Sequence, residues 1–168
     1  SSYLVLGHKI PPRAHKDSYV FDVISAILGK GQSGRIFDEI RNKRGLSYEV
    51  GVNCESSFDH GMFAIHASVN KDKINLVKDL IMKEFKNLDT VSEKELNESK
   101  GFIEGSYILE MEDTYKLSDQ LSFWELVGDA KLNDAYLKKI RAVSRDDVTR
   151  VSRKFLNENY TLALIKPK

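Results

Sequence analysis

Cysteine, proline and tryptophan are scarce in this 168-residue sequence, which has one cysteine, three prolines and one tryptophan. The single cysteine, Cys54, excludes an internal disulfide, and it also excludes a cluster of thiolates that could hold a metal ion. A reducing compartment is the simplest expectation for such a chain. We therefore expect a cytoplasmic protein.

The sequence also lacks a long apolar run and an imbalance of charge. No apolar stretch approaches the roughly 20 residues of a membrane-spanning helix, and the start of the chain lacks the basic and apolar segments of a signal peptide. The 26 basic and 25 acidic residues leave a formal net charge of +1, which provides no electrostatic footprint for nucleic acid or an anionic membrane. We expect neither as a partner.

The length and the 41% hydrophobic content predict one domain over residues 1–168 with a core of its own. A strand-like run, Tyr3-Leu4-Val5-Leu6, stands at the very start without any lead-in. This abrupt opening indicates a fragment of a longer protein or one half of a pair.

Apolar periodicity predicts the elements of the first 70 residues. They are a strand at Tyr3–Leu6, a helix over 20–28 that Gly29-Lys30-Gly31 ends, a short helix over 35–42, and strands over 48–58 and 63–69. The last two strands flank the turn signal Asp59-His60-Gly61, so they should form an antiparallel hairpin. In the first of them, Tyr48 alternates with Val50, Val52 and Cys54 on the apolar face.

The remainder of the chain is predicted to be mostly helical. The expected helices cover 74–88, 92–111, 117–126, 132–140 and 144–155, and a strand over 160–165 closes the chain. Ser92 with Glu95, and Ser144 with Asp147, have the spacing of capping boxes. These elements predict an α+β fold, in which an antiparallel or mixed β-sheet is packed on one face by several α-helices.

The four histidines do not have the spacing of a metal site. They are His8, His15, His60 and His66, and none belongs to an HxxEH or HExxH pair. His60 and His66 share a strand face, but a rise of ~3.3 Å per residue separates them by roughly 20 Å. We expect no metal and no cofactor on this chain, with one histidine in the turn and one on the polar side of the strand.

Three other motifs have simpler structural interpretations. The GxGxxG pattern at 29–34 follows a helix and not a strand, so it indicates a turn between helices, not a nucleotide site. Cys54 is expected to pack as a small hydrophobe, and Glu110, Glu112 and Asp113 to form a solvated acidic face. Gly101 and Gly105, four residues apart on one helix, are expected to allow close internal packing.

The segment from Leu28 to Tyr48 resembles the hallmark of one peptidase family. Its residues, LGKGQSGRIFDEIRNKRGLSY, are similar to the pattern LGGGxSSRLFxxIRxxxGLxYxV of the pitrilysin and mitochondrial processing peptidase group of zinc peptidases. The match is to their second, metal-free half, and the flanking strands and hairpin extend it over essentially the whole chain. The sequence departs from the pattern at Lys30 and Gly34, which places the contacts of this loop in question.

This resemblance implies a function and a partner. In the family, a first half carries HxxEH and a distant glutamate, which bind zinc and activate water, and the second half closes over it. Zinc is then expected on the partner half, in the same polypeptide or in a separate subunit. The family's arginine and tyrosine, seven residues apart, map onto Arg41 and Tyr48. The resemblance implies that Arg41 grips a peptide carbonyl and that Tyr48 is an oxyanion donor.

Two functions of different classes stay open at this point. The first is the substrate-binding half of a zinc-dependent endopeptidase, which is inactive alone because it lacks HxxEH. The alternative is a non-catalytic scaffold or assembly subunit related to processing-peptidase or respiratory-complex core proteins, and a free-standing binding domain is a third interpretation. Arg41 and Tyr48 also have a structural interpretation. Arg41 lies near a helix C-terminus, and Tyr48 is predicted on an apolar strand face.

Overall fold

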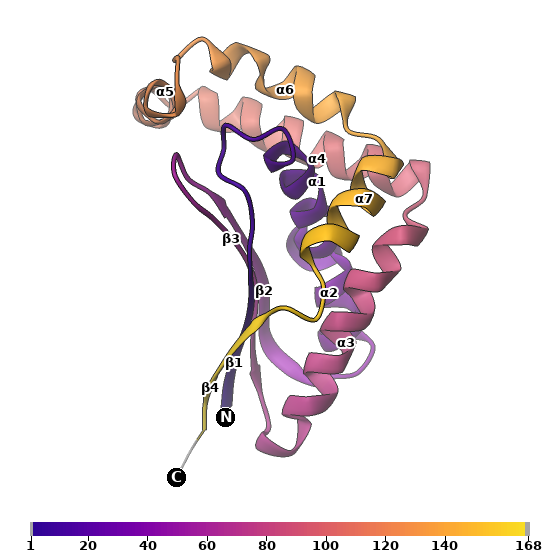
Figure 1. Ribbon diagram of the computed structural model, residues 1–168. Helices are drawn as coiled ribbons and strands as arrows, with labels where there is room; N and C mark the ends of the chain where they lie inside the picture. The colour runs from indigo at the N-terminus through magenta and orange to yellow at the C-terminus, as the bar shows by residue number, and fades with distance from the viewer. Residues whose placement is uncertain (1, 167–168) are drawn as a thin grey trace.

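The computed structural model describes residues 2–166 and contains a four-stranded antiparallel sheet (Figure 1). The strand order is β2-β3-β1-β4, so β2 and β4 form the two edges. The strands are β1 (Ser2–Lys9), β2 (Ser47–Ser56), β3 (Gly61–Val69) and β4 (Thr161–Ile165). β2 and β3 form the predicted antiparallel hairpin.

Helices account for most of the remaining described residues, and each predicted helix is present. They are α1 (Ser18–Gly29), α2 (Arg35–Phe37), α3 (Ile74–Lys86), α4 (Glu93–Met111), α5 (Thr114–Val127), α6 (Leu132–Ala142) and α7 (Arg145–Phe155). A π-helical turn, Asp38–Asn42, continues α2. Within residues 2–166, no helix is both long and apolar enough to cross a bilayer.

The helices lie on one side of the sheet and leave its other face open (Figure 1). Along β1 the alternation is regular: Leu4 and Leu6 are fully buried, whereas Tyr3 and Val5 are exposed. The buried side chains pack against α1, whose apolar residues join those of the sheet in one core. The predicted α+β class, with helices on one face of the sheet, is therefore confirmed.

The two predicted capping boxes differ in the structure. Ser144 and Asp147 form both reciprocal hydrogen bonds at the start of α7. At the start of α4, the Ser92 hydroxyl accepts a hydrogen bond from the Glu95 amide, but the Glu95 carboxylate is held by Arg35. The second box is thus half formed, because a long-range ion pair takes the carboxylate away from the local backbone.

The glycine turn between α1 and α2 is set by close backbone contacts. A Cβ atom on Gly34 would lie 2.5 Å from the Leu28 carbonyl oxygen and 2.7 Å from the Gly29 Cα. Gly31 has a φ of 50°, a left-handed backbone conformation that residues other than glycine rarely adopt. The motif is therefore a turn between helices, as predicted.

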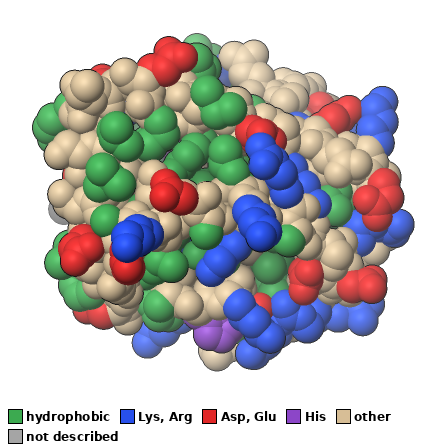
Figure 2. All heavy atoms as spheres, turned by 90° about the horizontal axis from the view of Figure 1, so that it is seen from above, with side chains coloured by type: hydrophobic (Ala, Val, Ile, Leu, Met, Phe, Trp, Pro, Cys, Tyr) green, Lys and Arg blue, Asp and Glu red, His purple; other side chains and the backbone are tan. Residues whose placement is uncertain are grey.

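The prediction that Gly101 and Gly105 pack internally is wrong. A Cβ atom built on either glycine would meet no atom within 4 Å, because this face of α4 points away from the rest of the described chain. Exposed apolar side chains on α4 and α5 are Phe102, Ile108, Leu109, Tyr115, Leu121 and Leu126. Figure 2, which looks down on the end of the molecule occupied by α4, α5 and α6 in Figure 1, shows apolar side chains among charged ones.

The two kinds of glycine should respond oppositely to alanine. Gly34→Ala is expected to lower the free energy of unfolding by about 1–3 kcal/mol, because the new methyl group would overlap backbone atoms that cannot rotate away. Gly101→Ala, the matched control in open space within a helix, should raise it by about 0.5–1 kcal/mol. Urea denaturation measures both values, and equal effects of the two substitutions would contradict this account.

Candidate functional site

Helix α2 is anchored by its first residue, Arg35. Its guanidinium forms two hydrogen bonds with the Glu95 carboxylate, at 2.6 and 2.5 Å, and a third with the Asn87 carbonyl oxygen at 2.9 Å. These contacts tie α2 to the end of α3 and to the first turn of α4. No local sequence pattern predicts this role of Arg35, because its partner Glu95 lies 60 residues away.

The π-helical turn and Gly45 determine where Arg41 lies. The Gly45 amide donates to the Arg41 carbonyl and the Leu46 amide to the Ile40 carbonyl, both at 2.9 Å, so the helical end closes on itself. Gly45 has a φ of 60°, which reverses the chain into β2. The reversal brings the start of β2 back beside the side chain of Arg41.

A β-bulge at the start of β2 turns Tyr48 away from the core. Ser47 pairs with Val69 and Val50 pairs with Ala67, so β2 contains one residue more than β3 over this stretch. The Ser47 hydroxyl lies 2.5 Å from the Glu49 carbonyl oxygen and 2.8 Å from that of Ser68. The extra residue reverses the alternation, and Tyr48 is 84% exposed. The prediction that Tyr48 shares an apolar face with Val50 is therefore wrong.

Arg41 and Tyr48 are brought together by these two features. The Cζ atom of Arg41 lies 4.6 Å from the centroid of the Tyr48 ring and 4.9 Å from that of the Phe37 ring. Both distances are within the range of a cation–π interaction. Within residues 2–166, neither the Arg41 guanidinium nor the Tyr48 hydroxyl has a hydrogen-bond partner. The pair therefore presents free donors, with Tyr48 exposed and Arg41 partly buried.

The histidines lie apart from each other and from this pair. His8 is buried and its Nε2 lies 2.8 Å from the Asn157 carbonyl oxygen, while burial lowers its pKa below the ordinary value. His60 lies in the hairpin turn with Nδ1 2.6 Å from Asp59, and His66 is exposed beside Gly51. Across the described residues, no three His, Cys, Asp or Glu side chains lie close enough to hold a metal ion. The residues present do not fit a zinc site.

The comparisons with known proteins agree with the hallmark segment. Residues 1–101 match the family described as the peptidase M16 inactive domain. This chain belongs to that family. The Bacillus subtilis protein named as the uncharacterized zinc protease YmxG is 31% identical over 169 residues, which cover 99% of this chain and 41% of that protein. The chain thus spans about two fifths of the length of this curated relative.

Solved structures share the fold of this M16 inactive domain. A protease from Helicobacter pylori gives a TM-score of 0.91 at 21% identity, over 99% of this chain and 41% of that chain. A chain of complex III2 from Candida albicans gives 0.84 at 16% identity, over 97% of this chain and 42% of that chain. The same fold therefore occurs in a chain named as a protease and in a chain of complex III2.

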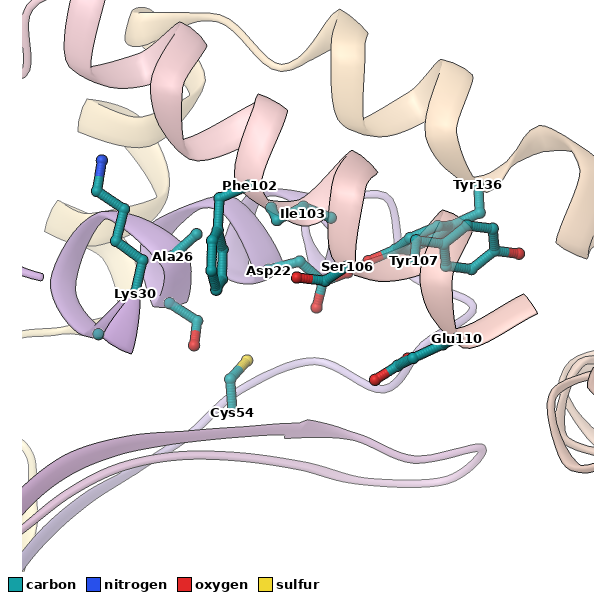
Figure 3. Close-up of a pocket in the computed structure, with 12 residues that line it drawn as sticks. Asp22, Ala26, Lys30, Cys54, Phe102, Ile103, Ser106, Tyr107, Glu110 and Tyr136 are labelled. Atoms are coloured by element: carbon teal, nitrogen blue, oxygen red, sulfur yellow. Dashed lines mark hydrogen bonds between the residues drawn. The ribbon is translucent and has the colours of Figure 1, made fainter. Parts of the chain in front are cut away.

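A pocket of about 270 Å³ lies between α1, α4 and β2 of the M16 inactive domain (Figure 3). Cys54 points into it from β2, while Phe102 and Glu110 point into it from α4. Asp22 lines its floor and accepts hydrogen bonds from Arg13, at 2.6 and 3.0 Å, and from the Tyr136 hydroxyl at 3.1 Å. Burial raises the pKa of Tyr136, so the hydroxyl stays protonated and serves as that donor.

Cys54 is expected to be a poor nucleophile. Burial, aided by the nearby Asp22 carboxylate, raises the pKa of its thiol to about 12, and the reactive species is the thiolate. At pH 8, iodoacetamide should therefore alkylate Cys54 at least ~10-fold more slowly than it alkylates glutathione. Mass spectrometry of timed samples measures the alkylation rate. The control is labelling in 6 M urea, where Cys54 should react at about the rate of a free thiol. Rapid labelling of the folded chain would contradict the packing role.

Proposed function

We propose that this domain is the substrate-binding half of a zinc-dependent endopeptidase. Residues 1–168 would form one folded unit. This unit would close over a separate half that carries HxxEH and zinc, either in the same polypeptide or in a second subunit. The observation that supports this most directly is the cation–π pair of the partly buried Arg41 and the exposed Tyr48. Because no protein group of the described chain accepts from these donors, they are available to a peptide main chain.

The geometry of the pair suits a peptide main chain. Contact with the Phe37 and Tyr48 rings restricts the plane of the Arg41 guanidinium, and its N–H groups lie in that plane. A restricted guanidinium loses less entropy when it donates to a peptide carbonyl oxygen. The Tyr48 hydroxyl can then donate to the oxygen that becomes negative when water attacks the peptide carbon.

The chain by itself is expected to bind but not to cleave. Its described residues hold no cluster that fits zinc, so the activated water must come from the other half. Hydrolysis should therefore require both halves. The length of the relative named as a zinc protease supports this, because that protein is more than twice as long as the region that matches this chain.

Replacement of the pair should lower hydrolysis in the complete two-half protein. Arg41→Ala and Tyr48→Phe are each expected to reduce kcat/KM for a fluorogenic peptide by roughly 100- to 1,000-fold, because each removes one donor to the transition state. The matched controls are Arg44→Ala, which removes an arginine paired with Glu39, and Tyr115→Phe, at a tyrosine that is 80% exposed. Both controls should stay within about twofold of the wild type. If Arg41→Ala and Tyr48→Phe behave like the controls, the gripping role is wrong.

A second candidate function is a non-catalytic scaffold or assembly subunit. The observation that favours it is the likeness in fold to a chain of complex III2. The two candidates differ in what accompanies the domain. An HxxEH segment in the full coding sequence, or in a chain that co-purifies with this one, supports the peptidase. Its absence from both supports the scaffold.

A further inference from the structure

Phe37 is a large aromatic side chain that lies outside the hydrophobic core. Ile36 and Ile40, on the same helical segment, are buried, whereas Phe37 is only partly buried. Within residues 2–166, its ring belongs neither to the core cluster nor to the partly buried apolar side chains that pack on that cluster. Filling the core is therefore not the role of this ring.

The ring of Phe37 instead lies against Arg41. The two residues are four positions apart along α2 and the π-helical turn that continues it, so their side chains lie about one turn apart on the same face. The Arg41 Cζ atom lies 4.9 Å from the centroid of the Phe37 ring and 4.6 Å from that of the Tyr48 ring. The guanidinium thus interacts with two rings, one from the helix and one from β2.

The fold holds these two rings to different degrees. Tyr48 is 84% exposed on the bulged part of the edge strand β2. Phe37 stands on a helical segment whose buried residues, Ile36 and Ile40, hold it against the core. Arg35 anchors the first turn of the same segment through its hydrogen bonds. Phe37 is therefore the more fixed of the two rings and is suited to orient the guanidinium.

An aromatic ring orients an arginine without occupying its donors. The neighbouring Arg44 shows the contrasting case, because the Glu39 carboxylate accepts two of its N–H groups, at 3.0 and 2.8 Å. A ring attracts the positive charge of a guanidinium without taking up its N–H groups as a carboxylate does. A guanidinium restricted in this way also loses less rotamer entropy when a ligand binds. Arg41 is thus held and still able to donate.

We propose that Phe37 is a positioning residue for the pair of Arg41 and Tyr48. Its ring holds the Arg41 guanidinium beside Tyr48, while the N–H groups stay free for a peptide carbonyl oxygen. Phe37 acts through Arg41 and not on the substrate. The inference rests on the proposed function for the roles of Arg41 and Tyr48, and it adds a residue to which that function assigns no role of its own.

The kinetic test uses the complete two-half protein and a fluorogenic peptide. Phe37→Leu keeps an apolar side chain but removes the ring, and it should lower kcat/KM by about 5- to 30-fold, the fold-change that corresponds to a partly desolvated cation–π contact. Phe37→Tyr keeps a ring and should stay within about twofold of the wild type. The matched control is Phe58→Leu, at a phenylalanine that is 53% exposed between β2 and β3, and it should also stay within about twofold.

A double-mutant cycle separates positioning from a general loss of structure. Because Phe37 acts through Arg41, Phe37→Leu should change kcat/KM less than about twofold when residue 41 is already alanine. Phe37→Leu should also divide its loss between kcat and KM in the same proportion as Arg41→Ala. A merely structural role would give the same loss in both backgrounds, and that result would overturn the proposal.

A second measurement needs no hydrolysis. In the 15N-labelled 168-residue chain, the Nε–Hε signal of Arg41 is identified by its loss in Arg41→Lys. The two rings should shift this signal from its position in the urea-unfolded chain and give it a large heteronuclear NOE, and Phe37→Leu should reduce both effects. Phe58→Leu should leave the signal in place. An unchanged Arg41 signal in Phe37→Leu would also overturn the proposal.

The outcomes distinguish this inference from the proposed function. If Arg41→Ala and Tyr48→Phe lower hydrolysis but Phe37→Leu does not, the positioning role is wrong and the proposed function stands. If neither Arg41→Ala nor Tyr48→Phe lowers hydrolysis, the proposed function fails. The Arg41 signal then still decides whether Phe37 holds the guanidinium.

Discussion

The enclosure of helix α1 is the constraint on which the rest of the structure depends. Nine of its twelve residues are buried, so this helix has almost no side that can face water. A helix that is apolar nearly all round must be covered on all sides. The sheet covers one side, and α4, α6 and α7 pack on the others. The two-layer arrangement of Figure 1, with its single open sheet face, follows from this requirement.

The same helix positions the candidate site. Gly29, at its C-terminal end, lies so close to Val52 that a Cβ atom there would come within 2.6 Å of the valine side chain, which fixes β2 against α1. The turn after Gly29 then leads to Arg41, and the bulge in β2 brings Tyr48 beside it. On its other side α1 supports α4, which leaves the free edge of β2 facing a pocket and not a helix surface.

Local rules predicted most of the fold. The hairpin around Asp59-His60-Gly61, the capping box at Ser144 and the end of α1 at the glycine turn each depend on residues a few positions apart. Local rules failed at Glu95, because a distant residue, Arg35, takes its carboxylate from the local capping bond. They also failed at Gly101, which faces open space although a glycine pair on a helix favours close packing.

The sequence by itself determined the family, the α+β class, the absence of any spacing that suits a zinc site, and the identity of Arg41 and Tyr48 as candidates. Only the tertiary structure decided that these two side chains meet, with Tyr48 exposed and Arg41 partly buried. One extra residue between Ser47 and Val50 reverses the strand alternation, and a period of two read along one strand cannot reveal a bulge. The pocket beside Cys54 was equally hidden, because its walls come from elements about 50 residues apart.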